Sequence, residues 1–318
     1  MSQQPEVVER LLVEEAAAIA AAAADVERRR PRYVVIAARG SSDNAARYAQ
    51  HLMGRFWHVP VALATPSLHT LYESPLRYDD ALVIGISQSG ESPDVAGVVS
   101  DATAQGALTI AITNEPDSPL AAGAQHVIGL QTGPERSVAA TKTYTASLAA
   151  VAALVSGTDA VAPAADAIAR QLAVEVPVVE WEKVAVIGRG ANYGTAFEAA
   201  LKLSELTGMV AVPWSSADFL HGPIAIVEPG FPILAIAPSG PTLAGMRRLL
   251  AVAGERGAEL TVVSDAPLQG RIPLEPVEEW LSPLVAVIPA QLLAVGAAEH
   301  LGRDVDRPTG LQKVTRTS

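Results

Sequence analysis

Residues 33–40 read Tyr-Val-Val-Ile-Ala-Ala-Arg-Gly, and residues 183–190 read Lys-Val-Ala-Val-Ile-Gly-Arg-Gly. Each is an apolar, β-type run that ends in Arg-Gly and leads into an alanine-rich helical stretch. The same offset of 150 residues places residues 82–90 on 232–240, so that one Ser-Gly pair falls on another. A third match follows in both halves, shifted by one residue. Three matches in one order predict an internal repeat and two similar domains.

The repeat also predicts the fold class. The expected strands lack polar alternation and are separated by helical stretches, as is typical of parallel sheets that helices cover on both faces. We therefore expect an α/β protein with two tandem, doubly wound, flavodoxin-like parallel-sheet domains. The strands are expected at residues 33–38, 82–86, 107–112 and 126–130 in the first half, and at 183–188, 232–237, 259–263 and 284–288 in the second.

The length of 318 residues and 33.0 kDa suits two domains. Residues 5–30 read as one long alanine-rich helix, for packing or for a dimer, that ends in three arginines. The expected order is an N-terminal helix (1–30), a first domain with a phosphate site (31–156), a linker with a short helix near 163–174 (157–177), a second domain with a catalytic helix (178–300) and a tail that closes on the site (301–318).

Composition excludes several classes of function. The net charge of -11 and a pI near 5.0 argue against binding to nucleic acid, and the absence of cysteine excludes disulfides and thiolate metal sites. The apolar run at 16–24 is too short to span a bilayer, and no secretory signal is visible. No spacing of histidine and acidic residues resembles a metal site. We expect a cytoplasmic protein.

Two loops at predicted strand ends are rich in hydroxyls and glycine. Gly40-Ser41-Ser42 follows the first strand, and Ser87-Gln-Ser-Gly-Glu-Ser92 follows the second. Hydroxyls, backbone N–H groups and helix N-termini could converge there on a phosphate, without an arginine or lysine inside either loop. The alternative is that these residues only cap helices and make turns. The second copy has lost most of the donors, so one phosphate site per chain is expected.

The expected helix at 195–206 is apolar on nearly every side except at Glu198, Lys202 and Glu205. These three share one face, and a carboxylate and an ammonium that meet in a cleft could serve as acid–base groups. The alternative is an exposed Glu–Lys pair, although only four lysines occur in the chain. His221 lies in a Phe-Leu-His-Gly-Pro turn and is a candidate for catalysis, though a lone histidine is more often structural.

Together these residues resemble the tandem sugar isomerase (SIS) family, and in particular the isomerase half of the glucosamine-6-phosphate synthases, over about residues 33–318. The motifs that carry the resemblance are Ser-Gln-Ser-Gly-Glu-Ser (87–92), Val-Ala-Ala-Thr-Lys-Thr-Tyr (138–144), Glu-Ala-Ala-Leu-Lys-Leu-Ser-Glu (198–205), Phe-Leu-His-Gly-Pro (219–223), and a tail with Asp-Val-Asp-Arg-Pro (304–308) and Leu-Gln-Lys (311–313).

The resemblance implies a role for each residue. Glu205 would move a proton between C1 and C2 of the sugar, Lys202 would support Glu205, and Lys313 would close over the open-chain sugar. His221 would open the sugar ring and would come from the neighbouring subunit of a homodimer. The implied substrate-binding residues are Ser42, Ser87, Gln88, Ser89 and Ser92 at the phosphate, Ser41 and Val138 at the sugar, and Glu198.

The synthases also carry an N-terminal glutaminase with a nucleophilic cysteine, and this sequence shows neither. The resemblance therefore implies a cofactor-free conversion of glucosamine 6-phosphate to fructose 6-phosphate and ammonia, or the reverse. Two alternatives stay open, namely a deglycase for fructosamine 6-phosphates and a non-catalytic module that binds a sugar phosphate.

Overall fold

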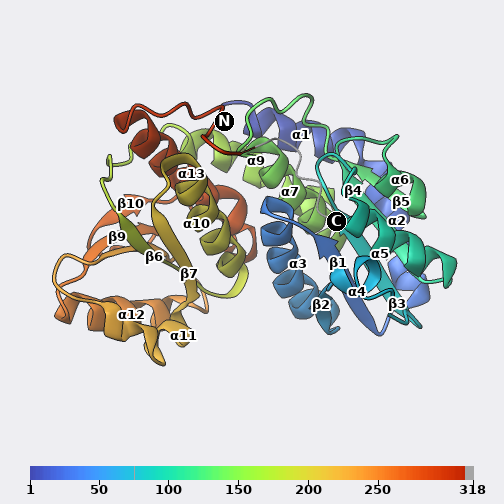
Figure 1. Cartoon of the computed structure of the whole chain (residues 1–318), viewed down its shortest axis with the longest axis horizontal. Coiled ribbons are helices and arrows are strands. Elements are labelled where there is room, and N and C mark those ends of the chain that lie inside the picture. Colours follow the sequence, from blue (N-terminus) through green and yellow to red (C-terminus); the bar gives the residue numbers. More distant parts are fainter. Residues whose placement is uncertain (75, 312–318) are drawn as a thin grey trace.

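The computed structural model describes residues 1–74 and 76–311 and contains two five-stranded parallel sheets, one in each half of the chain (Figure 1). The strand orders β2-β1-β3-β4-β5 and β7-β6-β8-β9-β10 are the same topology, which confirms the doubly wound α/β fold and its repeat. The strands are β1 Tyr33–Ala38, β2 Val61–Leu63, β3 Ala81–Ile86, β4 Leu108–Thr113, β5 His126–Gly129, β6 Lys183–Gly188, β7 Val210–Ser215, β8 Pro232–Ile236, β9 Glu259–Ser264 and β10 Arg271–Pro273.

Helices cover both faces of each sheet, and α3 and α10 face each other between the two halves (Figure 1). The helices of the first half are α1 Gln4–Glu14, α2 Ala16–Arg29, α3 Ser41–Trp57, α4 Ser67–Thr70, α5 Pro93–Ala104, α6 Pro119–Gly123 and α7 Lys142–Ser156. Those that follow are α8 Thr158–Val161, α9 Pro163–Gln171, α10 Tyr193–Thr207, α11 Ser216–Leu220, α12 Leu243–Glu255 and α13 Ser282–His300, with short 3₁₀ turns at Gly190–Asn192, Pro223–Ile226 and Glu279–Leu281.

The interior explains why the strands lack polar alternation. Every residue of β3 and β4 is buried, because helices pack against both faces of the sheet. The largest hydrophobic cluster contains residues of both halves, including Ile36 of β1, Leu203 of α10 and Leu284 of α13. The two sheets therefore share the core between them, where α3 packs against α10, and each sheet has a second, separate hydrophobic cluster on its other face.

The strand predicted at 284–288 is wrong, because these residues lie in α13. The run is apolar without a break, and such a run fits a buried helix as well as a buried strand. The fifth strand of the second sheet is instead the three-residue β10, which has too few residues to show a pattern. The helical stretch Glu279–His300 is long and apolar enough to cross a membrane, but 83% of its most apolar window is buried inside the protein.

The N-terminal segment also differs from the prediction, since it forms two helices that meet at Glu15. The carboxylate of Glu15 accepts hydrogen bonds from the backbone N–H of Gly129 and from the side chain of Gln131. Helix α1 packs against α7 and α9. This packing gives the segment a role within the chain, so the argument that it is free to form a dimer loses its force.

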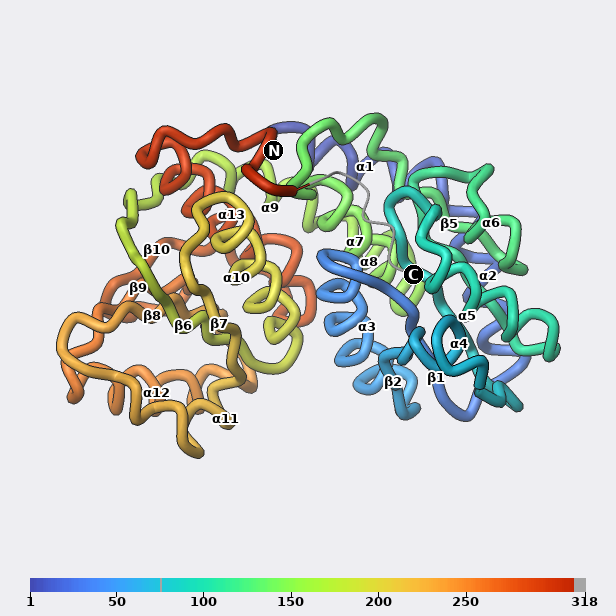
Figure 2. The backbone as a smooth tube through the Cα atoms, in the orientation of Figure 1, coloured from blue at the N-terminus to red at the C-terminus, as the bar shows by residue number. Residues whose placement is uncertain are grey.

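The segments at the two other predicted boundaries are also packed. The expected linker at 157–177 contains α8 and α9, and Ile168 of α9 is fully buried. The tail leaves α13 and runs back over the molecule to the loop before α7 (Figure 2). There the backbone N–H of Val138 donates to the carbonyl of Asp306 at 3.2 Å.

Candidate active site

A cavity of about 460 Å³ opens where the carboxyl ends of β1 and β3 face the start of α7 and one side of α10. It brings together nine of the twelve predicted site residues, and the tail reaches it at Leu311. The nine are Ser41, Ser42, Ser87, Gln88, Ser89, Ser92, Val138, Lys202 and Glu205. The other lining residues are Arg39, Gly40, Ile86, Glu115, Ala140, Thr143, Tyr144 and Ser147.

The serine-rich end of this cavity lies where two helices begin. Gly40 precedes α3 and Ser92 precedes α5, so two helix N-termini point to the region where the hydroxyls gather. Gly90 has a φ of +62°, and a Cβ there would lie 2.0 Å from the Ser118 hydroxyl. Only glycine fits that turn, and the turn brings the Gly90 N–H to within 3.2 Å of Ser87 Oγ.

The guanidinium of Arg39 lies beside the serine-rich end of the cavity, although neither loop contains an arginine or lysine. Arg39, the residue just before Gly40, lines the cavity, and its Nη2 lies 2.6 Å from Oδ2 of the buried Asp94. Half of the Arg39 side chain stays exposed. The sequence signal for it was the Arg-Gly pair that ends the first strand of both copies.

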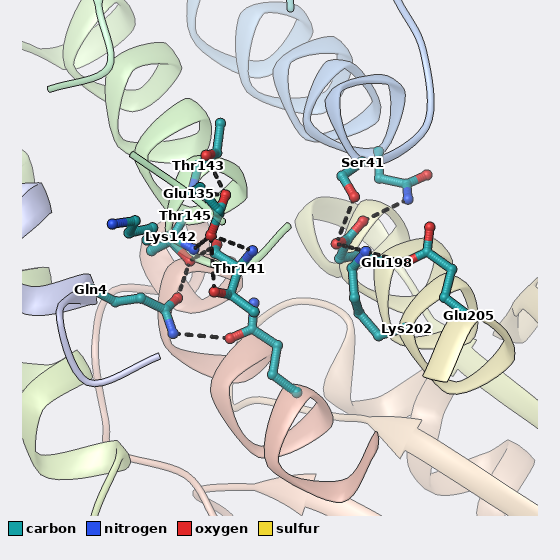
Figure 3. Close-up of polar contacts among 12 residues, drawn as sticks. Gln4, Ser41, Glu135, Thr141, Lys142, Thr143, Thr145, Glu198, Lys202 and Glu205 are labelled. Carbon is teal, nitrogen blue, oxygen red and sulfur yellow. Dashed lines mark hydrogen bonds and ion pairs between the residues drawn. The ribbon is translucent and has the colours of Figure 1, made fainter. Parts of the chain in front are cut away.

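The opposite side of the cavity carries the charged residues of α10 (Figure 3). The Lys202 ammonium lies 2.5 Å from Oε2 of Glu205 and 3.5 Å from Oε1 of Glu198, and only 2% of the lysine side chain is exposed. Burial lowers the pKa of Lys202, but the two carboxylates more than offset that effect, so the pKa is raised and the group stays an ammonium. The exposed Glu–Lys pair considered as an alternative is therefore excluded.

Glu198 lies behind the cavity and does not line it. It is fully buried, and both of its oxygens accept hydrogen bonds from the first domain, one from Ser41 Oγ at 3.0 Å and one from Asn44 Nδ2 at 2.8 Å. Burial raises the pKa of Glu198, although Lys202, Asn44 and Ser41 all oppose that shift. Asn44 was missed by the sequence analysis, because an asparagine in the first turn of a helix is an ordinary residue there.

The third wall is the start of α7, where Glu135 organises the backbone (Figure 3). Its carboxylate accepts hydrogen bonds from the backbone N–H groups of Thr141, Lys142 and Thr143. Tyr144 follows and contributes to the lining. The Tyr144 hydroxyl is buried and has no hydrogen-bond partner within the described chain.

Two predicted catalytic residues are not in this cavity. His221 is exposed at the end of α11 and does not line the cavity that holds Glu205. Lys313 lies outside the described residues. Among the residues that the structure describes, no group of three or more histidine and acidic side chains could hold a metal ion.

The equivalent place in the second domain is filled by the protein itself. Glu279 lies against the two glycines that match Gly40 and Gly90, since a Cβ on Gly240 would lie 2.8 Å from Glu279 Cγ and one on Gly190 would lie 3.6 Å from Oε1. The Glu279 carboxylate pairs with Arg55 of α3 at 2.7 Å. The expectation of one phosphate site per chain stays a prediction.

Comparisons with known proteins show what the chain is similar to. The SIS domain family matches residues 29–157 and 178–300. The glutamine–fructose-6-phosphate aminotransferase (isomerizing) of Shouchella clausii is 34% identical over 304 residues, which cover 88% of this chain and 50% of that protein. The chain thus spans about half the length of the curated relatives it matches.

Two solved structures extend the likeness to the fold. A protein from Silicibacter pomeroyi described as a phosphosugar isomerase has a TM-score of 0.88 and 33% identity, over 96% of this chain and 98% of that chain. The C-terminal domain of glucosamine-fructose-6-phosphate aminotransferase from Francisella tularensis has a TM-score of 0.80 and 25% identity, over 96% of both chains.

Proposed function

The chain belongs to the SIS domain family, and from this premise we propose that it converts glucosamine 6-phosphate and water to fructose 6-phosphate and ammonia. The observation that carries the proposal is the composition of one cavity, where a serine-rich anion site faces the carboxylate of Glu205. A module that only binds a sugar phosphate would need the serines but would have no use for a carboxylate and a buried ammonium at the other end.

In the proposed binding mode, the phosphate lies among Ser42, Ser87, Ser89 and Ser92, at the N-termini of α3 and α5. Hydroxyls, backbone N–H groups and two helix dipoles favour an anion there. The sugar then extends along Val138 and the start of α7 toward Glu205. The substrate is thereby held by one domain, while the second domain supplies the proton-transfer group.

The proposed chemistry begins when His221 moves a proton between the ring oxygen and O1, which opens the sugar to its aldehyde. Glu205 then removes the C2 proton while O1 gains a proton, which gives an enolamine, and Glu205 returns its proton to C1. The iminium at C2 loses a proton, which balances the one that O1 gained, and water hydrolyses the resulting imine to the ketone of fructose 6-phosphate and ammonia. The Lys202 ammonium, 2.5 Å from Glu205, would stabilise the negative charge that develops on the substrate.

The same proposal requires a homodimer in which His221 comes from the second subunit. His221 is exposed and outside the cavity of its own chain, so a complete site needs a histidine from another copy. Glu205→Gln and His221→Ala should each lower turnover by at least about a hundredfold. A mixed dimer of the two variants would hold one site with both native residues, so mixing should restore activity to about a quarter of the wild-type rate.

The test of the reaction is ammonia release across a panel of hexosamine and fructosamine 6-phosphates. We expect release from glucosamine 6-phosphate and exchange of its C2 proton with deuterated solvent. Both should fall by roughly 10²–10⁴ in Glu205→Gln while binding survives. Release from fructosamines alone would identify a deglycase, and binding without turnover anywhere in the panel would identify a regulatory module. No recovery on mixing would refute the shared site.

A further inference from the structure

Asn44 connects the two domains at the site of the proposed chemistry. It lies in the first turn of α3, and its side chain donates to Oε2 of Glu198 on α10 at 2.8 Å. Only 6% of Asn44 and none of Glu198 is exposed, so water does not compete for this hydrogen bond. With Ser41 on Oε1, the first domain holds both oxygens of a carboxylate that belongs to the second domain.

Glu198 in turn acts on the group that the reaction uses. Its Oε1 lies 3.5 Å from the Lys202 ammonium, and that ammonium lies 2.5 Å from Glu205. Glu205 lines the cavity, whereas Asn44 and Glu198 do not. The contacts therefore form one series, Asn44 to Glu198 to Lys202 to Glu205, which starts in the first domain and ends at the cavity.

We propose that Asn44 is a positioning residue for the reaction, which keeps Glu198 ionised so that Glu198 shares the charge of Lys202 and leaves Glu205 free to accept the substrate proton. The inference rests on the proposed role of Glu205 as the base. Asn44 itself touches neither substrate nor reacting atoms in this scheme.

The physical reason is the balance of charge around one buried lysine. Full burial favours the protonated form of Glu198 and raises its pKa, and the donors Asn44 and Ser41 oppose that effect. Without the Asn44 donor, Glu198 would take up a proton at a higher pH. The Lys202 ammonium would then be balanced by Glu205 alone, and Glu205 would be held in that ion pair.

Few other ionisable groups face this series. Burial, together with Glu198 and Tyr48 of α3, raises the pKa of Tyr144 of α7 well above its usual range, so Tyr144 stays neutral. Where α3 meets α10, Arg47 pairs with Asp43 and stacks on the Phe197 ring. The strands β7 and β8 carry no ionisable side chain, and in β6 and α13 the ionisable residues lie at the ends, in Lys183, Glu299 and His300.

The direct test uses the lysine signals of the protein without substrate. Because the chain contains four lysines, ¹³C-labelled lysine gives few signals, and Lys202→Met identifies the one of interest. In a pH titration, we expect the chemical shift of the Lys202 signal to change in a step at the pH where Glu198 ionises. The step should move to higher pH in Asn44→Ala, move further in Asn44→Asp, where a second carboxylate is added, and disappear in Glu198→Gln.

Asn192→Ala is the matched control. Asn192 is also a buried asparagine near the start of α10, but its side chain donates to Ser282 at 2.7 Å and not to Glu198. The Asn192→Ala variant should lose about as much stability as Asn44→Ala, but the pH of the Lys202 step should stay as in wild type. An identical step in wild type, Asn44→Ala and Asn44→Asp would overturn the proposal, as would an equal shift in the control.

The kinetic test separates positioning from a merely structural role. In Asn44→Ala, kcat should fall about tenfold at the acidic end of the pH profile and recover as pH rises, while KM changes by less than about threefold. Adding Asn44→Ala to Glu198→Gln should not lower kcat any further. A fall in kcat that is the same at every pH, or that adds to the fall caused by Glu198→Gln in the double variant, would refute the proposed role of Asn44. If wild type turns over no substrate, the proposed function fails, and the titration still decides whether Asn44 controls Glu198.

Discussion

Replacing Lys202 by methionine removes the ammonium that lies between two carboxylates and keeps a side chain of four heavy atoms in its place. Lys202 is 2% exposed and Glu198 is fully buried, so Glu198 would remain as an unpaired charge away from water. Breaking a buried pair in this way costs about 3–5 kcal/mol of the free energy of unfolding. We expect a loss of that size at pH 8, measured by urea denaturation.

Lys183 provides a control with the same substitution. Its ammonium also lies 3.5 Å from a glutamate oxygen, that of Glu228, but 59% and 68% of the two side chains are exposed. An exposed pair of this kind contributes about 0–1 kcal/mol. The comparison of Lys202→Met with Lys183→Met therefore sets a buried lysine between two carboxylates against an exposed lysine with one carboxylate, while the atoms removed are the same.

The loss in Lys202→Met should also depend on pH. Burial already raises the pKa of Glu198 above its ordinary value of 4.5, and removal of the ammonium raises it further. The folded variant then holds a proton that the unfolded chain releases, so its stability falls as pH rises above 4.5. The difference from wild type should be small at pH 5 and widen toward pH 8. A loss equal to that of Lys183→Met, or one that does not change with pH, would refute this account of the site.

The anion site and the buried phenol allow two further tests. Ser87→Ala combined with Ser89→Ala should weaken the binding of a hexose 6-phosphate in calorimetric titration by about 1.5–3 kcal/mol per hydrogen bond lost. Ser239→Ala, which changes the exposed counterpart in the second domain, should have no effect on binding. Unchanged affinity in the double variant would show that these serines do not bind the phosphate. Tyr144→Phe should raise the free energy of unfolding by about 1–3 kcal/mol, because the hydroxyl that it deletes is buried without a partner among residues 1–74 and 76–311. Tyr48→Phe should lower that free energy, since the Tyr48 hydroxyl donates to the Trp280 carbonyl at 3.0 Å; a loss in both variants would show that Tyr144 has a partner after all.

The sequence predicted the repeat, the sheets and most of the cavity because these depend on local patterns. Apolar runs without alternation marked seven of the ten described strands, and hydroxyls at strand ends marked the loops that line the cavity. The six-residue strand β7 was missed because none of its residues is fully buried, and the three-residue strands β2 and β10 were missed because they are too short to show a pattern. The run at 284–288 was misassigned because burial on all sides removes the periodicity that separates a helix from a strand. Asn44 could not be predicted, since its importance depends on a partner 154 residues away in the sequence.

Glu279 makes the two halves of the repeat different at the place where the first half has its serine-rich cavity. In the second domain, a carboxylate of the chain already occupies the position between the two glycine turns, and it is anchored to Arg55 of the other domain. The first domain has no such internal anion among its described residues. If a phosphate binds there, as proposed, each half of the repeat would hold one anion at the corresponding place, one taken from solution and one supplied by the chain itself. Glu279 would then exclude a second phosphate from the second half.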